Sequence, residues 1–513
     1  MGAVRTSRQA APAPPETLRG EIESFLASCR RPALMEPGFA PLALAGGCYA
    51  LTVRGAALTL EAWDGTRTFA RRLLRIVERK GGRLHAAAER FGRGAALVTL
   101  FDLEDARAAP ALRRNQQQTL AERLRAMLAR QYPGWRVEEL TSGADLVHSL
   151  SPAHPRALIS RRGRSLAAIC AAPGDAGRAL TFGLIWLAYV RRRGAARRAH
   201  GLALFLPRGE EEDTRVRLRH LNPDKASFDL FVYDPDGGEQ PVNLEDTGNL
   251  FAKLEPWRAA DPPGATEAAQ WARRLALEPG VEAVEMGGGV RSLRVAGLEF
   301  ARLAGRELWA GLGRKRRARS LEEPLGLARR LAAVRLDPDA PRTHAWVRQA
   351  PEARLESLVR ANLAALDPLL LPEPVYGQVC ALAGRGRGVA DLLALDLHGR
   401  LAVIELKADE DPHLPLQALD YWIRVRRHAA AGEFGPAGYF PGRAVRRDAP
   451  RLLLAAPALR FHPATETLLS FFPSEVEVER IGLGVEWQRS FRVVLRVAGA
   501  ARPEWPQARN GDR

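Results

Sequence analysis

Hydrophobic positions recur along this 513-residue chain with two periods, one typical of strands and one typical of amphipathic helices. After a Pro- and Ala-rich start that we expect to be disordered (1–14), short strand-like runs continue to about residue 105. Within them, a basic stretch from Phe69 to Val77 has apolar residues at helical spacing. These patterns predict a small α+β domain over residues 15–112.

Residues 113–250 mix helical and strand patterns in an order rich in βα units. An amphipathic helix is predicted from Gln117 onward, and an apolar helix is predicted over 179–190. The predicted strands lie at 135–140, 156–160, 165–170, 201–206 and 227–233. We expect a compact α/β domain here.

Residues 255–340 read as a connector, because turn-forming residues (261–263 and 278–289) surround one helical run (265–277). A strand pair comes next, and a helix with the cap signature Ser320 and Glu323 ends the connector. A basic cluster follows the strand pair and consists of Arg314, Lys315, Arg316, Arg317 and Arg319. The cluster is a candidate contact for phosphate groups, and the alternative is a solvated segment in an arginine-rich protein.

The C-terminal region, 345–498 before a tail at 499–513, contains the most informative pattern. Two apolar strands, Val389–Asp396 and Arg400–Lys407, flank the short sequence Leu-His-Gly. A two-residue turn would place Asp391 opposite Leu406, whereas a three-residue loop with Gly399 in the left-handed conformation places Asp391 opposite Glu405. We favour the three-residue loop, because it pairs Asp396 with Arg400 and puts glycine where φ is positive.

In that register Asp391, Glu405 and Lys407 project from one face of the sheet, while Ile404 and Leu406 point to the other. Two facing carboxylates repel each other unless a cation lies between them. Oxygen ligands of this kind, with water and phosphate oxygens, suit Mg²⁺. Lysine at 407 strengthens the hypothesis, because the chain has only five lysines and uses arginine almost everywhere else.

These residues resemble the PD-(D/E)XK nuclease superfamily, whose pattern is an Asp on one strand and Glu-x-Lys on the next. The flanking elements extend the resemblance: a helix at 351–368 precedes the hairpin, and a helix at 414–427, a strand, a helix and a strand follow it, as far as Leu483. The resemblance implies a restriction-endonuclease-like fold of order α-β-β-β-α-β-α-β, closest to NucS-type endonuclease domains. It also implies Mg²⁺ or Mn²⁺ as cofactor and DNA as substrate.

In that family the acid of the first helix and a Gln after Glu-x-Lys join the site, which here implies Glu352, or else Glu356, and Gln417. Asp64, Glu78 and Lys80 repeat the spacing, but we expect a helix between them, so the acid and the amine would diverge. Further candidate DNA contacts are Arg385 and Arg387, in a glycine-rich loop, and Tyr421. The alternatives are a solvated loop for the arginines and a core position for the tyrosine.

The middle region has elements in the same order as the C-terminal region, and its LAAICAAPG corresponds to LAVIELKAD. Cys170 then occupies the place of Glu405, and Ala172 the place of Lys407. We therefore expect a degenerate, nuclease-like domain without metal ligands, unless its strand order differs from that of the C-terminal region.

The composition is typical of a soluble globular protein, and the length and the patterns together predict a multidomain α/β chain. The formal charge of +17 suits an anionic partner such as DNA. Four scattered cysteines and the lack of a long apolar run predict a cytoplasmic protein that does not associate with membranes. We expect a metal-dependent DNA endonuclease of repair or defence, and a homodimer stays an open alternative. The competing hypotheses are an inactive nucleic-acid-binding protein and an interaction scaffold.

Overall fold

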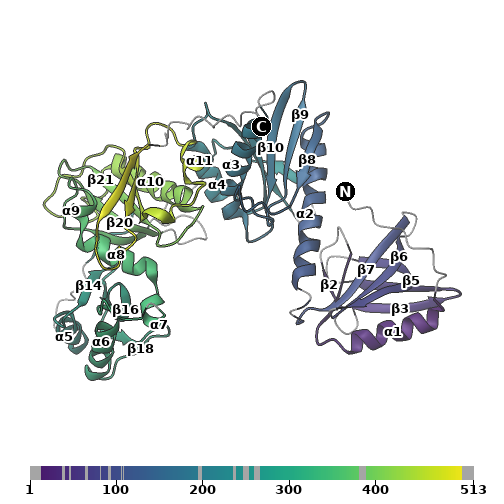
Figure 1. The fold of residues 1–513 in the computed structure, drawn as a ribbon, viewed down its shortest axis with the longest axis horizontal. Coiled ribbons are helices and arrows are strands. Elements are labelled where there is room, and N and C mark those ends of the chain that lie inside the picture. The colour runs from purple at the N-terminus through teal and green to yellow at the C-terminus, as the bar shows by residue number, and fades with distance from the viewer. Residues whose placement is uncertain are drawn as a thin grey trace, which may run out of the picture. The chain divides into compact units, whose positions relative to one another are not determined.

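The computed structural model describes residues 13–36, 41–44, 48–63, 68–80, 82–90, 94–105, 107, 109–194, 199–234, 238–246, 254–258, 266–341, 343–380 and 389–499. These residues form a mixed α/β protein with four β-sheets (Figure 1). Contacts divide the chain into two units, residues 1–172 and 173–513. Most of the predicted disordered start and of the predicted tail lies outside the described residues. In the described part, no helix is long and apolar enough to cross a membrane.

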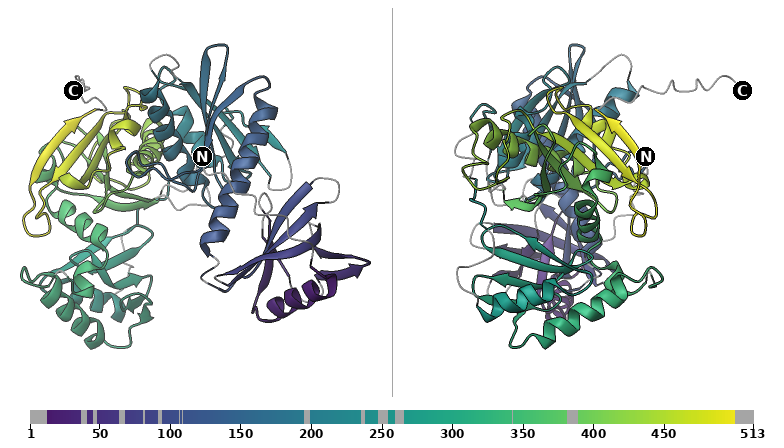
Figure 2. Two further views of the ribbon diagram at one scale, coloured as in Figure 1. Left: turned by 45° about the vertical axis from the view of Figure 1, so that its right-hand side comes forward. Right: turned by 90° about the vertical axis from the view of Figure 1, so that its left-hand side faces the viewer.

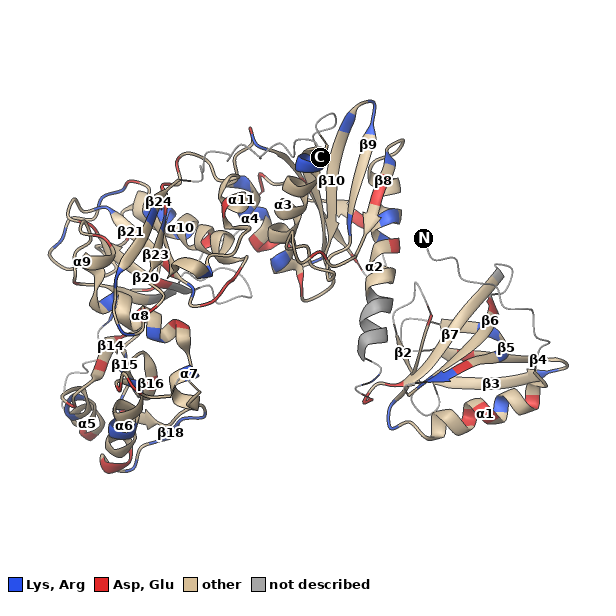
Figure 3. Cartoon of the chain, in the orientation of Figure 1, with Lys and Arg blue, Asp and Glu red and all other residues tan. Residues whose placement is uncertain are grey.

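The first unit begins with a helix packed on a seven-stranded sheet of order β2-β1-β7-β6-β5-β4-β3. The elements are α1 (Pro15–Ala27), β1 (Pro32–Met35), β2 (Leu42–Ala43), β3 (Tyr49–Arg54), β4 (Ala57–Trp63), β5 (Thr68–Lys80), β6 (Arg83–Arg90) and β7 (Gly94–Asp102). α1 buries Ile22 and Phe25 against the sheet. Acidic and basic residues alternate on its outer face, where Arg19 lies near Glu16 and Glu23 (Figure 3). Part of the high charge is therefore locally compensated.

The predicted helix at Phe69–Val77 is wrong, because this segment belongs to strand β5. β5 pairs with β4 and β6, and its pairing with β6 shifts register twice, between Leu73 and Arg75 and between Ile76 and Glu78. Each irregularity breaks the two-residue period, which explains the helix-like spacing. Glu78 and Lys80 are exposed on β5, and Asp64 lies outside the described residues.

The first unit ends with a long helix and an antiparallel three-stranded meander. These elements are α2 (Ala109–Gln131), β8 (Arg136–Thr141), β9 (Arg156–Arg161) and β10 (Arg164–Cys170). The predicted strands match within one residue at each end, and the predicted helix begins eight residues earlier than expected.

The second unit begins with two helices and two parallel strands, to which a short antiparallel strand is added. Their bounds are α3 (Ala176–Arg193), β11 (Ala199–Pro207), α4 (Glu212–Arg219), β12 (Ser227–Tyr233) and β13 (Glu239–Pro241). Helix α4 was not predicted, because its sequence EDTRVRLR contains only two apolar positions.

The predicted connector contains a folded body with its own core. Its strands form an antiparallel sheet in chain order, where we had predicted only a strand pair. The elements are α5 (Glu267–Ala276), β14 (Val281–Glu285), β15 (Val290–Val295), β16 (Leu298–Ala304), β17 (Glu307–Ala310), β18 (Arg316–Arg317), α6 (Glu322–Arg335) and α7 (Ala345–Arg348). Leu275 of α5 and Leu331 of α6 pack against Phe300 of the sheet.

The C-terminal sheet has six strands in chain order, β19 to β24. Its elements are α8 (Pro351–Ala361), α9 (Leu363–Leu366), β19 (Tyr376–Cys380), β20 (Val389–Leu395), β21 (Leu401–Leu406), α10 (Leu414–Ala431), β22 (Arg451–Pro457), a 3₁₀ turn (Ala458–Arg460), α11 (Thr465–Leu469), β23 (Val478–Leu483) and β24 (Val493–Ala498). Every predicted element of this region is present, and β24 is additional. The sheet and its helices can be followed in Figures 1 and 2.

The C-terminal region repeats the strand-pairing pattern of the middle region. β8, β9 and β10 form an antiparallel meander, as do β19, β20 and β21. β11 and β12 are parallel and β13 is antiparallel to β12, and the same holds for β22, β23 and β24. In both regions one helix precedes and one helix follows the first of the parallel strands. A different strand order in the middle region would have contradicted the expected repeat, and the described strands do not show one.

Equivalent helices of the two regions contact each other reciprocally within the second unit. α3 contacts α11, and α10 contacts α4. The α4 to α10 contact includes a bidentate ion pair in which Arg217 donates to Asp420 at 2.8 and 2.5 Å. At α3, the hydroxyl of Thr181 lies 2.9 Å from Nδ1 of His413. Such an exchange of contacts is the pattern of a two-fold symmetric interface.

Gly399 provides a test of the hairpin geometry. Its φ is +81°, and a Cβ at this position would lie 2.5 Å from the carbonyl oxygen of Ala444. Gly442 also has positive φ, +72°, but has open space around it. We expect Gly442→Ala to cost about 1–2 kcal/mol and Gly399→Ala to cost more, as measured by thermal unfolding. Equal losses in the two variants would contradict this close approach.

Candidate functional site

The β20–β21 hairpin has the predicted three-residue loop. Leu395 pairs with Leu401 and Leu392 with Ile404, so continuing this register places Asp391 opposite Glu405. The backbone N–H of Asp396 donates to the carbonyl of Arg400 at 2.8 Å, and Gly399 has the expected left-handed conformation. The alternative two-residue turn is therefore excluded.

The two faces of this hairpin are covered by different helices. Ile404 and Leu406 belong to a core that includes Leu355 and Val359 of α8. Side chains at the intervening positions project to the other face, and α10 contacts β20, β21 and β22. The predicted division between apolar and functional positions of β21 is therefore confirmed for Ile404 and Leu406.

Asp391 lies where the hairpin strands separate. Its Oδ2 accepts a hydrogen bond from the backbone N–H of Leu406 at 2.8 Å. Burial raises the pKa of Asp391 to about 7, while this hydrogen bond and the charge of Lys407 act in the opposite direction. The carboxyl group is therefore held in place but is costly to ionise.

Glu405 is the most deeply buried group of the site, with 0% exposure. Among the described residues, neither of its carboxylate oxygens has a hydrogen-bond partner. Burial raises the pKa of Glu405 well above its ordinary value, and the charge of Asp391 raises it further. The charge of Lys407 opposes this rise without cancelling it. A buried carboxylate in this state calls for a compensating cation.

Lys407 and Glu352 come together at the end of β21. The Nζ of Lys407 lies 3.5 Å from Oε1 of Glu352, in the first turn of α8, and 4.0 Å from Oδ2 of Asp411. Burial lowers the pKa of Lys407, but the charges of Glu352, Glu405 and Asp391 outweigh burial and raise it overall. Lys407 therefore stays an ammonium group beside the two carboxyls.

The two predicted first-helix acids have different surroundings. The side chain of Glu352 is 57% exposed, whereas Glu356 is buried and pairs with Arg294 at 3.1 Å and with Arg360 at 2.9 Å. Glu352 is thus the acid available to a ligand. Asp411 was missed by the prediction, although it lies in the acidic run directly after Lys407.

Gln417 and Tyr421 are stacked one turn apart on α10, as predicted. The Nε2 of Gln417 lies 3.4 Å from the hydroxyl oxygen of Tyr421. Burial raises the pKa of Tyr421 to about 12, and the charge of Glu405 contributes to the rise. Tyr421 is only 4% exposed, so it borders the carboxylates from inside the core.

The remaining candidate contacts are the two loop arginines and the basic cluster. Arg385 and Arg387 lie outside the described residues. In the basic cluster, Lys315 forms an ion pair with Glu299 at 2.9 Å, and Arg317 one with Glu307 at 3.2 Å. Arg314 and Arg316 are exposed. Part of the cluster is therefore neutralised within its own sheet.

The donor set fits a divalent cation that keeps part of its water shell. In the described part of the chain, no group of three or more His, Cys, Asp and Glu side chains is placed to hold a metal. Asp391 and Glu405 provide two carboxylates, and Glu405 has both oxygens without partners. Mg²⁺ is commonly held by one or two carboxylates, with water and substrate phosphates as the other ligands.

Comparisons with protein-family models, with curated proteins and with solved structures found no match to this chain.

The buried carboxyls predict a gain in stability when their charge is removed. The folded-state pKa of Asp391, about 7, lies above its ordinary value of 3.8, so the folded chain loses stability as the pH rises from 4 to 7. Without divalent cations, Asp391→Asn and Glu405→Gln should raise the melting temperature by a few degrees at pH 8, but not at pH 4. The exposed Glu486→Gln serves as a control. If Asp391→Asn and Glu405→Gln melt at or below the temperature of the unmodified chain at pH 8, the two buried carboxyls do not destabilise the fold and the prediction is wrong.

Proposed function

We propose that this protein is a metal-dependent nuclease that hydrolyses phosphodiester bonds of DNA. The observation that carries the proposal is Glu405, a fully buried carboxylate without hydrogen-bond partners that faces Asp391 across the hairpin. The order of elements from α8 to β23 and the Asp, Glu-x-Lys pattern support a PD-(D/E)XK-like domain.

Each residue has a distinct part in this proposal. Asp391 and Glu405 would hold Mg²⁺ or Mn²⁺, and Glu352 stands at the exposed edge as a further acid. The bound ion supplies positive charge to the phosphate and lowers the pKa of a water molecule. Lys407 keeps an ammonium group beside the carboxyls, where it neutralises charge that builds on the phosphate oxygens. Gln417 and Tyr421 border the carboxylates and restrict access of bulk water.

Hydrolysis balances with water alone as the second reactant. The oxygen of water forms a bond to phosphorus, and one bond from phosphorus to a sugar oxygen breaks. The attacking water loses a proton, and the departing sugar oxygen gains one. No redox partner or nucleotide cofactor is needed.

We also propose that the middle region is a nuclease-like copy without metal ligands. Neither β9 nor β10 contains an Asp or Glu, and Cys170 and Ala172 correspond in sequence to Glu405 and Lys407. The reciprocal contacts between α3, α4, α10 and α11 support an internal two-fold arrangement with a single carboxylate pair. A chain of this kind cuts one strand at each encounter.

The single carboxylate pair predicts nicking. Supercoiled plasmid incubated with Mg²⁺ or Mn²⁺ should accumulate as open circles, at a rate proportional to protein concentration. Gel electrophoresis over a range of protein concentrations measures this. Linear plasmid as the first product, with a rate that rises as the square of concentration, would indicate paired catalytic subunits instead.

Loss of the charged groups should abolish cleavage while DNA binding is retained. We expect Lys407→Ala and Glu405→Gln to reduce the cleavage rate by about 100-fold or more, a loss comparable to removing one transition-state contact. Lys225→Ala and Glu322→Gln, at exposed positions away from the site, are the matched controls.

Mn²⁺ should also raise the melting temperature of the unmodified chain but not that of Glu405→Gln, because only the native carboxylate pair binds the ion. If Lys407→Ala cleaves DNA as fast as the control Lys225→Ala, or if a metal chelator leaves the cleavage rate unchanged, the nuclease proposal fails. The alternative, an inactive nucleic-acid-binding protein, predicts binding without cleavage in every variant.

A further inference from the structure

The folded body at residues 266–335 meets α8 at the tip of one hairpin. A two-residue turn, Ala296 and Gly297, joins β15 to β16, and both residues have positive φ, +45° and +78°. A Cβ on Gly297 would overlap the backbone carbonyl group of Ala353 in α8. Since Ala353 directly follows Glu352, the tip lies against the helical turn that carries this acid of the candidate site.

Arg335 of α6 connects this hairpin with the segment before α8. Its side chain is fully buried and donates to four backbone carbonyl groups. Two belong to the hairpin, Val295 at 3.1 Å and Ala296 at 2.7 Å. The other two, Trp346 and Gln349, precede α8. A guanidinium group has five N–H donors in a fixed plane, so it can link several acceptors in one geometry.

The same body also contacts the middle of α8. Arg294 of β15 lies 3.1 Å from Oε1 of Glu356, and both side chains are buried. The hydroxyl of Ser357 donates to Glu282 of β14 at 2.6 Å. Glu356 lies one turn after Glu352 on the helix, so these contacts fix the turn next to the candidate site.

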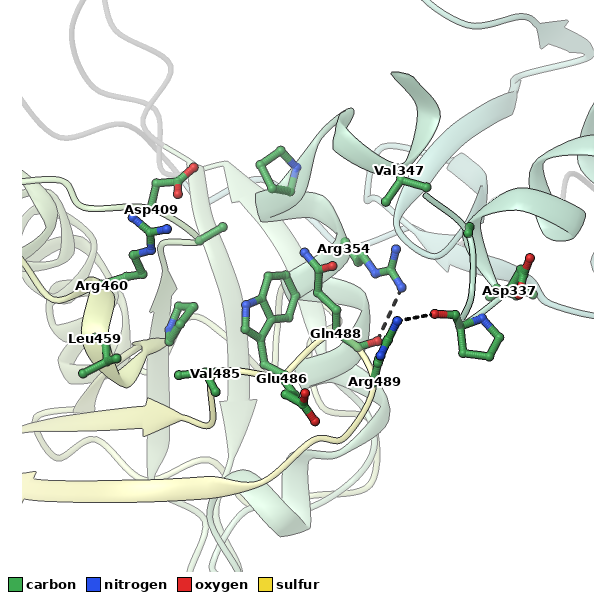
Figure 4. Close-up of a pocket in the computed structure, with 17 residues that line it drawn as sticks. Asp337, Val347, Arg354, Asp409, Leu459, Arg460, Val485, Glu486, Gln488 and Arg489 are labelled. Atoms are coloured by element: carbon green, nitrogen blue, oxygen red, sulfur yellow. Dashed lines mark hydrogen bonds between the residues drawn. The ribbon is translucent and has the colours of Figure 1, made fainter. Parts of the chain in front are cut away.

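The first turn of α8 is less firmly packed on its other side. Pro351 and Arg354 line a cavity of about 670 Å³, in which Arg354 donates to the carbonyl of Gln488 at 3.4 Å (Figure 4). Atoms that border a cavity lack the close contacts that fix a well-packed element. The contacts with the hairpin tip are therefore important for the position of this turn.

We propose, on the basis of the nuclease function proposed above, that the body at residues 266–335 is a positioning element of the candidate site. The turn at Ala296 and Gly297 sets the place of α8, and α8 sets the distance of 3.5 Å between Glu352 and Lys407. The body acts through the helix and does not touch the reacting atoms. Its effect on the rate can still be large, because a misplacement of about 1 Å can cost about 100-fold.

NMR of the full-length chain tests this positioning without metal or DNA. The chain has only five lysines, so lysine labelled with ¹³C at Cε gives five signals. The Lys407 signal reports the contact with Glu352. The signal of Lys315, which lies 2.9 Å from Glu299 of β16, reports whether the body is intact. Lys407→Arg and Lys315→Arg assign the two signals.

We expect Gly297→Ala to move the Lys407 signal in the same direction as Glu352→Gln, because the added methyl group displaces α8. Gly305→Ala is the matched control, since Gly305 also has positive φ, +59°, in the next hairpin of the body but has open space around it. It should leave the Lys407 signal in place. In the Glu352→Gln background, Gly297→Ala should cause no further shift. An equal shift in that background would overturn the inference, because Glu352 would then not be the group that moves.

A second variant applies if Gly297→Ala does not fold. Arg294→Gln removes the ion pair with Glu356, but Arg360 stays 2.9 Å from the same carboxylate, so the buried acid keeps a partner. This variant should also move the Lys407 signal. An unchanged Lys407 signal in both variants would overturn the inference.

Plasmid cleavage distinguishes this inference from the nuclease proposal. With Mg²⁺, Gly297→Ala should cleave about tenfold more slowly than Gly305→Ala or slower still. Equal cleavage by these two variants would contradict the positioning. If the unmodified chain does not cleave DNA, the nuclease proposal fails, and the NMR signals still decide whether the body positions Glu352.

Discussion

Two carboxyl groups that face each other across the β20–β21 hairpin are the constraint on which the rest of the site depends. The three-residue loop fixes the register, and the register puts Asp391 opposite Glu405. Burial then makes ionisation of both groups unfavourable, and the single ammonium of Lys407 offsets only part of the cost. A folded protein retains such an arrangement when a ligand or a reaction makes use of it, as is common at catalytic centres.

The surrounding structure holds the two carboxyl groups in place without removing the cost of ionising them. α8 packs on the apolar face of the hairpin and brings Glu352 to Lys407, while the ion pair of Glu356 with Arg294 of β15 anchors the same helix. On the other face, α10 carries Tyr421, whose pKa the charge of Glu405 raises, and Gln417 lies 3.4 Å from the Tyr421 hydroxyl. The outer side of α10 is used for contact with α4 through Asp420 and Arg217. One helix therefore connects the candidate site to α4 of the middle region.

Much of the C-terminal region was predictable because its strands have strong apolar patterns and its hairpin has a glycine at the one position that needs positive φ. The expected charge pairing of Asp396 with Arg400 chose the correct register, but the pairing itself is not observed: Asp396 accepts the backbone N–H of Arg400, and the guanidinium of Arg400 pairs with Glu477. Other features depend on tertiary contacts that periodicity does not encode. The two bulges of β5 imitate helical spacing, α4 is too polar to be recognised, and β14 lies in a stretch that resembles a turn.

The central claim is that Asp391 and Glu405 together bind a divalent cation, and calorimetric titration with Mn²⁺ tests it most directly. Because burial raises the pKa of Asp391 to about 7 and that of Glu405 well above its ordinary value, binding at pH 6.5 should release protons. The apparent enthalpy should then depend on the ionisation enthalpy of the buffer, and Glu405→Gln should abolish binding. Mn²⁺ binding of equal strength in Glu405→Gln, or no binding by the unmodified chain, would contradict the account.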